Sequence, residues 1–221
     1  MAVCLGSARV CVIRVSRLNS TCSCVPGATG AVVSSAIVRL AASPEYETGD
    51  EFIQKNGCGD IELSIKDVDR LKRINLQLEL ATRDMELLEL LTGGTLYVDG
   101  LGEPEGFARR GIGAAANDPV AVELWTRAIS TAGTCQADTS TWWRWTYPKA
   151  QFTLGDTTLE NGIATVQLTG FAEANPNYGD GCFNDWPATD AIDPDSPEHF
   201  TFDTAPPTTA CGYITVPAQT S

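Results

Sequence analysis

The sequence predicts a mainly β protein: an antiparallel β-sandwich or partly closed barrel with one short flanking α-helix at about residues 83–92 and long loops or arms. Three observations point to this fold class. Several segments alternate apolar and polar residues, one segment carries apolar residues at helical spacing, and Gly, Pro and Asp gather between these segments. With 221 residues, of which 43% are hydrophobic, the chain can bury a core, and we expect a single domain over residues 1–221.

The clearest strand pattern lies between residues 61 and 80. Residues 61–65 and 74–80 alternate with a period of two, which is typical of strands with one buried and one solvated face. The segment that follows the first of them, 66–70, is short enough for a hairpin connection. We therefore predict an antiparallel pair whose polar face carries Glu62, Ser64, Gln77 and Glu79.

The period changes in the next segment. Residues 84–91 have apolar side chains at helical spacing and acids in the first turn, where they complement the helix dipole. Thr82 is the predicted N-cap, and Gly93-Gly94 provides the left-handed exit that a helix end favours. So short a helix needs a sheet to pack against.

The other strands are predicted from β-branched and aromatic runs bounded by turn residues. They lie at residues 8–18, 31–40, 120–131, 142–154, 162–170 and 213–216. The segment 43–58 and the glycine-rich segment 99–118 are predicted to be loops. Beyond Asn175 the chain is rich in Pro and Asp, so we expect an extended segment at about 176–221.

The net charge of −13 is unevenly distributed along the chain. Residues 1–40 hold four arginines and no acid, whereas residues 150–221 hold ten acids and no Lys or Arg. Such an acidic chain repels polyphosphate, which argues against nucleic-acid binding through a basic patch. The acidic loops either keep the protein soluble or give it two oppositely charged ends that suit head-to-tail association with its own copies.

The spacing and sequence context of the Cys, His, Gly and Asp residues match no known catalytic or metal-binding motif. The eight cysteines lack zinc spacing, and His199, the single histidine, stands in an acidic segment without a nucleophile motif. Gly111-Ile-Gly113 lacks the strand and helix that nucleotide binding requires, and the Asp residues at 190–195 lack EF-hand spacing. We expect no enzyme, metal or cofactor, and Cys182 with Cys211 is the candidate disulfide because both lie in loop-rich segments.

The aromatic run at residues 142–147 has two interpretations. On a strand, Trp143, Trp145 and Tyr147 share one face. Exposed aromatic rings in a row stack on sugars or bases, whereas Trp and Tyr are also common in cores and subunit interfaces. The second interpretation is favoured, because only Arg144 and Lys149 supply positive charge nearby.

Several turn and strand patterns, taken in order along the chain, resemble a known family. They are Arg14–Leu18, Cys22–Cys24, Lys55–Gly59, Asp84–Gly93, Ala121–Thr126, Trp145–Pro148, Leu159–Gly162, Leu168–Ala172 and Asn175–Gly181. In these patterns the chain resembles the major tail (tail tube) proteins of long non-contractile-tailed bacteriophages, especially those infecting actinobacteria.

The resemblance implies a structural virion protein that is not an enzyme. Six copies would close a ring, and stacked rings would form the hollow tube through which the genome is ejected. Assembly would take place in the cytoplasm of the host bacterium, with the tape measure and terminator proteins as further partners. DNA would pass through the lumen without specific binding, and no membrane would be involved.

The resemblance also assigns roles to particular residues. Glu62, Gln77 and Glu79 become candidates for the lumen, although a solvent-exposed outer face is the other interpretation of their position. The segment 43–58, with Tyr46, Phe52 and Ile53, becomes a candidate ring-stacking loop. The alternative function is a secreted carbohydrate-binding β-sandwich that uses the Trp142–Tyr147 strand, but the first residues lack the apolar region of a signal peptide.

Overall fold

The computed structural model describes residues 5–115, 117–130, 141–156, 165–188, 191–209 and 212–219. In these ranges the chain is mainly β with one short helix, which confirms the predicted fold class. The strands of the main sheet are β1 (Leu5–Arg17), β2 (Gly27–Ser34), β3 (Ile37–Glu47), β6 (Arg70–Leu80), β9 (Val120–Ser130), β10 (Trp142–Leu154), β11 (Val166–Glu173), β12 (His199–Asp203) and β13 (Tyr213–Val216). Two separate hairpins pair β4 (Glu51–Lys55) with β5 (Ile61–Lys66) and β7 (Thr95–Val98) with β8 (Pro104–Ala108).

The main sheet is antiparallel and curls without closing into a barrel. Its order is β13-β2-β1-β9-β10-β11-β6-β3, and β12 pairs with the first half of β10 where β11 pairs with the second half. The end strand β3 comes close to β1. The sheet therefore approaches a barrel that has one gap, between β1 and β3.

Two apolar layers lie on the two faces of this sheet. The inner layer gathers alternate residues of β1, β6, β9, β10 and β11, such as Ile13, Leu78 and Leu168, together with helix α1 (Met85–Thr92). The outer layer lies between β1, β2 and β9 and the C-terminal segment, and includes Trp125, Tyr178 and Ile192. The predicted extended segment thus covers one face of the sheet.

Helix α1 closes one end of the inner layer and begins two residues after its predicted start. Asp84, rather than the predicted Thr82, is the N-cap, and its side chain accepts a hydrogen bond from the Leu87 amide. Gly93 ends the helix with φ 65° and donates its amide to Glu89. Four leucines of the helix are buried, which supplies the packing that so short a helix needs.

The predicted pairing of residues 61–65 with 74–80 is wrong, although both segments are strands. β5 pairs with β4, whereas β6 pairs with β3 and β11. The segment predicted as a loop at 43–58 therefore consists of the end of β3, all of β4 and a turn. Alternation identified the strands, but the tight turn at residues 56–60, held by the Asn56 side chain, decides the partner.

Three further expectations need correction. The predicted strand at 31–40 is divided between β2 and β3, and the predicted loop at 99–118 contributes β8 to a hairpin with β7. The strand expected at 162–170 appears as β11, while residues 157–164 lie outside the described residues. The strands expected near 8–18, 120–131, 142–154 and 213–216 are confirmed as β1, β9, β10 and β13.

Candidate assembly interface

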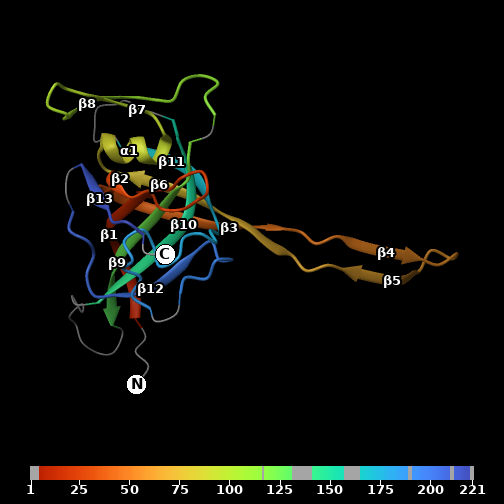
Figure 1. The fold of residues 1–221 in the computed structure, drawn as a ribbon. Helices are drawn as coiled ribbons and strands as arrows, with labels where there is room; N and C mark the ends of the chain where they lie inside the picture. The colour runs from red at the N-terminus through yellow and green to blue at the C-terminus, as the bar shows by residue number, and fades with distance from the viewer. Residues whose placement is uncertain are drawn as a thin grey trace.

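A long β-hairpin projects from the body of the protein, as Figure 1 shows. We call β4, β5 and the turn between them the arm. β3 and β6 lead into it, and at its base the Asp67 amide donates to the Asp50 carbonyl oxygen at 2.9 Å. Every side chain from residue 51 to residue 72 is exposed. The arm therefore contributes nothing to the core of its own chain.

The arm has one apolar face and one polar face. Alternation along β5 places Ile61, Leu63 and Ile65 on the same side, and the pairing of Phe52 with Ile65 adds Phe52 to them. These side chains are between 48% and 60% exposed. Ile53 lies opposite Ser64 and so faces the other way, which separates it from Phe52, the neighbouring stacking candidate. Tyr46, the third candidate, lies below the arm in β3, opposite Leu71.

A groove of about 660 Å³ occupies the gap between β1 and β3, and we call it the slot. Its lining is mainly apolar and includes Val10, Val38, Leu40, Ile74, Leu124 and Trp145. Val38 and Tyr46 at the slot are 48% and 59% exposed. A volume of this size matches clefts that bury a small organic molecule, so the slot can take several large side chains.

The three lumen candidates do not lie together. Gln77 and Glu79 project from β6 on the face of the sheet opposite the core, whereas Glu62 lies on the polar face of the arm. Arg39 in β3 faces Glu79 across the strand pair, so this face carries both charge signs. The prediction of a shared strand pair for Glu62, Gln77 and Glu79 is therefore wrong.

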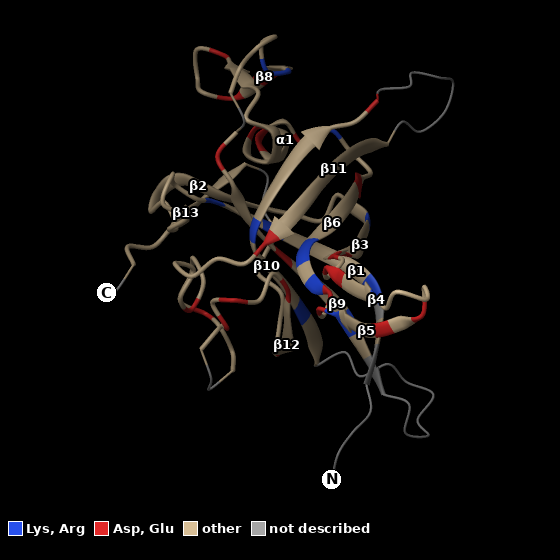
Figure 2. Ribbon diagram, turned by 90° about the vertical axis from the view of Figure 1, so that its right-hand side faces the viewer, with Lys and Arg blue, Asp and Glu red and all other residues tan. Residues whose placement is uncertain are grey.

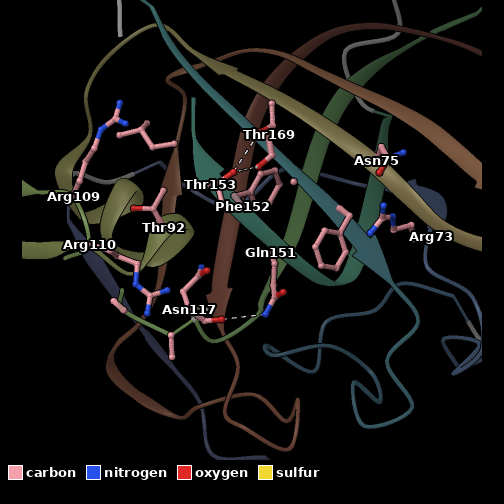
Figure 3. Close-up of a pocket in the computed structure, with 15 residues that line it drawn as sticks. Arg73, Asn75, Thr92, Arg109, Arg110, Asn117, Gln151, Phe152, Thr153 and Thr169 are labelled. Atoms are coloured by element: carbon pink, nitrogen blue, oxygen red, sulfur yellow. Dashed lines mark hydrogen bonds between the residues drawn. The ribbon is translucent and has the colours of Figure 1, made fainter. Parts of the chain in front are cut away.

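A second groove lies on this polar face, beside β6, β10 and β11 (Figure 3). Strand residues such as Asn75, Gln151 and Thr169 form one side, and Arg110 and Asn117 come from the loop after β8. The Gln151 side chain donates to the Asn117 carbonyl oxygen, which fixes the loop to the sheet. The groove has a mixed lining, in which polar side chains alternate with apolar ones such as Phe152 and Phe171.

The aromatic side chains of β10 lie partly in the core and partly at the surface. Tyr147 is buried and its hydroxyl donates to Glu198; burial and this bond both raise the pKa of Tyr147. Trp143 and Trp145 are only partly buried and pack against β12, where the Trp143 ring centroid lies 4.1 Å from that of Phe202. Phe200 and Phe202 are 59% and 44% exposed, so a small aromatic surface remains.

A buried ion cluster fixes the C-terminal segment to the sheet. Its members are Arg14 of β1, Glu123 of β9, Arg144 of β10 and Asp185. Both Arg14 and Arg144 donate to Glu123, and Arg14 also binds Asp185 through two hydrogen bonds of 2.8 and 2.9 Å. Burial alone raises the pKa of Glu123, but the two guanidinium groups outweigh it and hold that pKa below its ordinary value.

The ion cluster reduces the number of unpaired positive charges in the N-terminal stretch. Of the four N-terminal arginines, Arg14 is neutralised in the cluster and Arg17 pairs with Glu89 at 2.8 Å. Arg9 and Arg39 remain as the surface charges of that stretch. Figure 2 places acidic residues along the loops of the C-terminal segment, where residues 150–221 contain no Lys or Arg. A charged residue in the middle of an apolar strand, as at positions 14, 123 and 144, was the available signal for the cluster.

The candidate disulfide is wrong in its partner. Cys182 is bonded to Cys24, with their Cα atoms 5.3 Å apart. The C-terminal segment lies on the turn between β1 and β2, where the Asn175 side chain also donates to the Cys22 carbonyl oxygen. Cys211 lies outside the described residues, and Cys11, Cys22 and Cys58 are free.

The described part of the chain offers no group of three or more His, Cys, Asp and Glu side chains that could hold a metal ion. His199 lies at the start of β12, half-buried, and burial lowers its pKa. Among the described residues, no helix has the length and apolar character needed to cross a bilayer.

Comparison with known proteins adds no family to these observations. A scan of protein-family models finds none that matches the chain, and a search of curated proteins finds no match.

Proposed function

We propose that this chain is a structural subunit that assembles with its own copies into a hollow tube, as a major tail tube protein of a long-tailed bacteriophage. The observation that carries the proposal is the arm, an exposed hairpin with a continuous apolar face. An isolated two-stranded hairpin is marginally stable in water. Burying the exposed half of Phe52, Ile61, Leu63 and Ile65 stabilises a contact by roughly 1 kcal/mol for each side chain.

The polar outer face supports the role of a conduit. Gln77 and Glu79 lie on the outer face of β6, where Arg39 stands opposite Glu79 in the strand pair, so this face carries both charge signs. A surface that carries both charge signs binds a polyphosphate chain less tightly than a purely basic patch does. DNA would slide along such a face without specific binding, and Glu62 on the arm would contact neighbouring subunits instead of the lumen.

The experiment is negative-stain electron microscopy of the purified protein, concentrated stepwise at low and high salt. The matched control lacks residues 51–66 and joins Asp50 to Asp67 through Asn-Gly, since these two residues already meet at the base of the arm. Hollow rings or tubes from the wild type, with single particles from the control, support the proposal. Equal assembly of the two proteins, or wild-type monomers that bind a polysaccharide, would contradict it.

The second candidate, carbohydrate binding, is favoured by the partly exposed rings of Trp143, Trp145, Phe200 and Phe202. Such a surface could stack on sugar rings. Its test is a titration of tryptophan fluorescence with soluble polysaccharides, using Phe200→Ala as the comparison protein. A saturable change that Phe200→Ala weakens would support this function, and an unchanged signal would exclude it.

A further inference from the structure

We propose that the arm of one copy docks its apolar face into the slot of a second copy. This inference rests on the proposed self-assembly and names the surface that the arm binds. The two surfaces hold seven of the fifteen large apolar side chains that are exposed in the described residues, among them Val38, Phe52, Leu63, Ile65 and Leu71. Contiguous apolar surface of this kind marks a protein–protein contact.

An arm cannot fill the slot of its own chain. β3 and β6 carry it away from the body, as Figure 1 shows, while the slot lies beside the root of the same two strands. The occupant must therefore come from outside. Because the arm and the slot are different parts of the chain, the contact can repeat head-to-tail from copy to copy into a ring or a filament, as the proposed tube requires.

The slot is built to take side chains, not an added strand. On the β3 side the edge includes Pro44, which lacks an amide, and two irregularities in register. On the β1 side two bulges and the positive φ of Arg9, 53°, interrupt the edge. The arm suits a slot that takes side chains, because β4 and β5 already pair with each other. Their common apolar face presents Phe52, Leu63 and Ile65.

Charge adds a smaller preference for a second copy. Arg39 lines the slot and stands opposite Glu79 in the β3–β6 pair, but it forms no salt bridge within the described part of the chain. The arm carries three acids, Glu51, Asp60 and Glu62, against the two bases Lys55 and Lys66, so its net charge is −1. An arm that places its apolar face in the slot brings these carboxylates to the rim near Arg39.

The test is disulfide crosslinking between two single-cysteine additions. Both are made in a Cys58→Ser background, since Cys58 is a free, exposed thiol at the tip of the arm. One protein carries Leu63→Cys on the apolar face, and the other carries Val38→Cys at the exposed rim of the slot. The matched control replaces Leu63→Cys by Ser64→Cys, one residue along on the polar face. The Cys58→Ser parent, treated in the same way, gives the background.

Mild oxidation of the Leu63→Cys and Val38→Cys mixture is expected to give about tenfold more heterodimer than the Ser64→Cys mixture, because docking raises the local thiol concentration. Equal yields from the two mixtures would overturn the proposal. So would Leu63→Cys alone crosslinking as strongly as the mixture, which would indicate arm-to-arm pairing.

A second measurement separates this proposal from the tube. If wild-type tubes form but the specific crosslink does not, the arm–slot contact is wrong and the tube proposal stands. If the crosslink forms but only dimers or open chains are seen by microscopy, the contact stands and the tube proposal is wrong. Leu63→Asp should raise the concentration at half-assembly by about tenfold or more, as for an apolar anchor, while Ser64→Asp should leave it nearly unchanged.

Discussion

Arg14 and Glu123 face each other across β1 and β9, and the Arg14 Nε group donates to Glu123 Oε2 where neither side chain reaches solvent. Arg144 approaches the same carboxylate from β10 on the other side. One carboxylate thus compensates two buried guanidinium groups, and Asp185 of the C-terminal segment forms a salt bridge with each of them. Charges removed from water in this way depend on every partner being present.

Replacing Glu123 by Gln is therefore expected to destabilise the fold by about 3–5 kcal/mol, since it leaves buried positive charge without its central partner. Urea unfolding followed by tryptophan fluorescence measures this. The control is Glu103→Gln in an exposed turn, which should change the free energy of unfolding by less than about 0.5 kcal/mol. Similar losses for the two variants would show that the cluster contributes no stability.

The same cluster predicts how stability depends on pH. The pKa values of Glu123 and Asp185 are lowered in the folded protein, because the arginines outweigh the effect of burial. Their contribution is fully present above their unfolded pKa values and is lost as the pH falls below about 4.5 and through the lower folded values. Unfolding free energies measured from pH 7 to pH 3 should fall mainly in this acid range, and less steeply for Asp185→Asn.

His199 adds a separate and smaller dependence of stability on pH. Burial lowers its pKa, so the neutral form is favoured in the folded state, and stability declines as the pH falls from 6.5 towards the folded pKa. His199→Gln should remove this part of the curve and leave the steeper acid part unchanged. A variant that instead flattened the region below pH 4.5 would contradict the assignment to Glu123 and Asp185.

The Cys24–Cys182 bond joins residues 158 positions apart, so it restricts a very long segment of the unfolded chain. Cys182→Ser is expected to lower the free energy of unfolding by about 2–5 kcal/mol. Thermal unfolding with and without reductant checks the cause: reductant should lower the midpoint of the wild type but not that of the variant. Peptide mapping that found Cys182 joined to Cys211 would contradict the structure.

The arm should be the least protected β structure in the free subunit. Its backbone bonds are exposed and no side chain from residue 51 to residue 72 is buried, so local opening costs little. Hydrogen exchange should be fast for the amides of β4 and β5 and slow for Leu76 and Leu78 in β6. Assembly should slow exchange in the arm; an arm that exchanges equally fast in assembled particles would not be an interface.

The sequence predicted what depends on local pattern. The period of two identified most strands, and the leucines with Gly93 identified helix α1. Strand pairing was less predictable, because residues 61–65 and 74–80 alternate equally well whichever neighbour they pair with. A loop was predicted where β4 lies, because residues 51–55 show no clear alternation; the signal for the hairpin was the turn pair Asn56-Gly57.

Long-range contacts were beyond prediction for a different reason. Asp185 belongs to a segment without periodicity, so its binding to Arg14 and Arg144 depends on a chain path that no local spacing encodes. The same path brings Cys182 to Cys24 rather than to Cys211. The slot required knowledge of the sheet order, because β1 and β3 are neighbours across a gap and are not paired.

The Cys24–Cys182 bond also decides how the protein would respond to tension along its length. A force applied to the C-terminal segment would first have to break the contacts of Asp185, β12 and β13, and the covalent bond would then stop the extension at Cys182. The load would then pass to the turn between β1 and β2 and from there into the central strands. A subunit held in this way can lose β12 and β13 from the edge of its sheet while the central strands, and the arm that continues from β3 and β6, keep their shape.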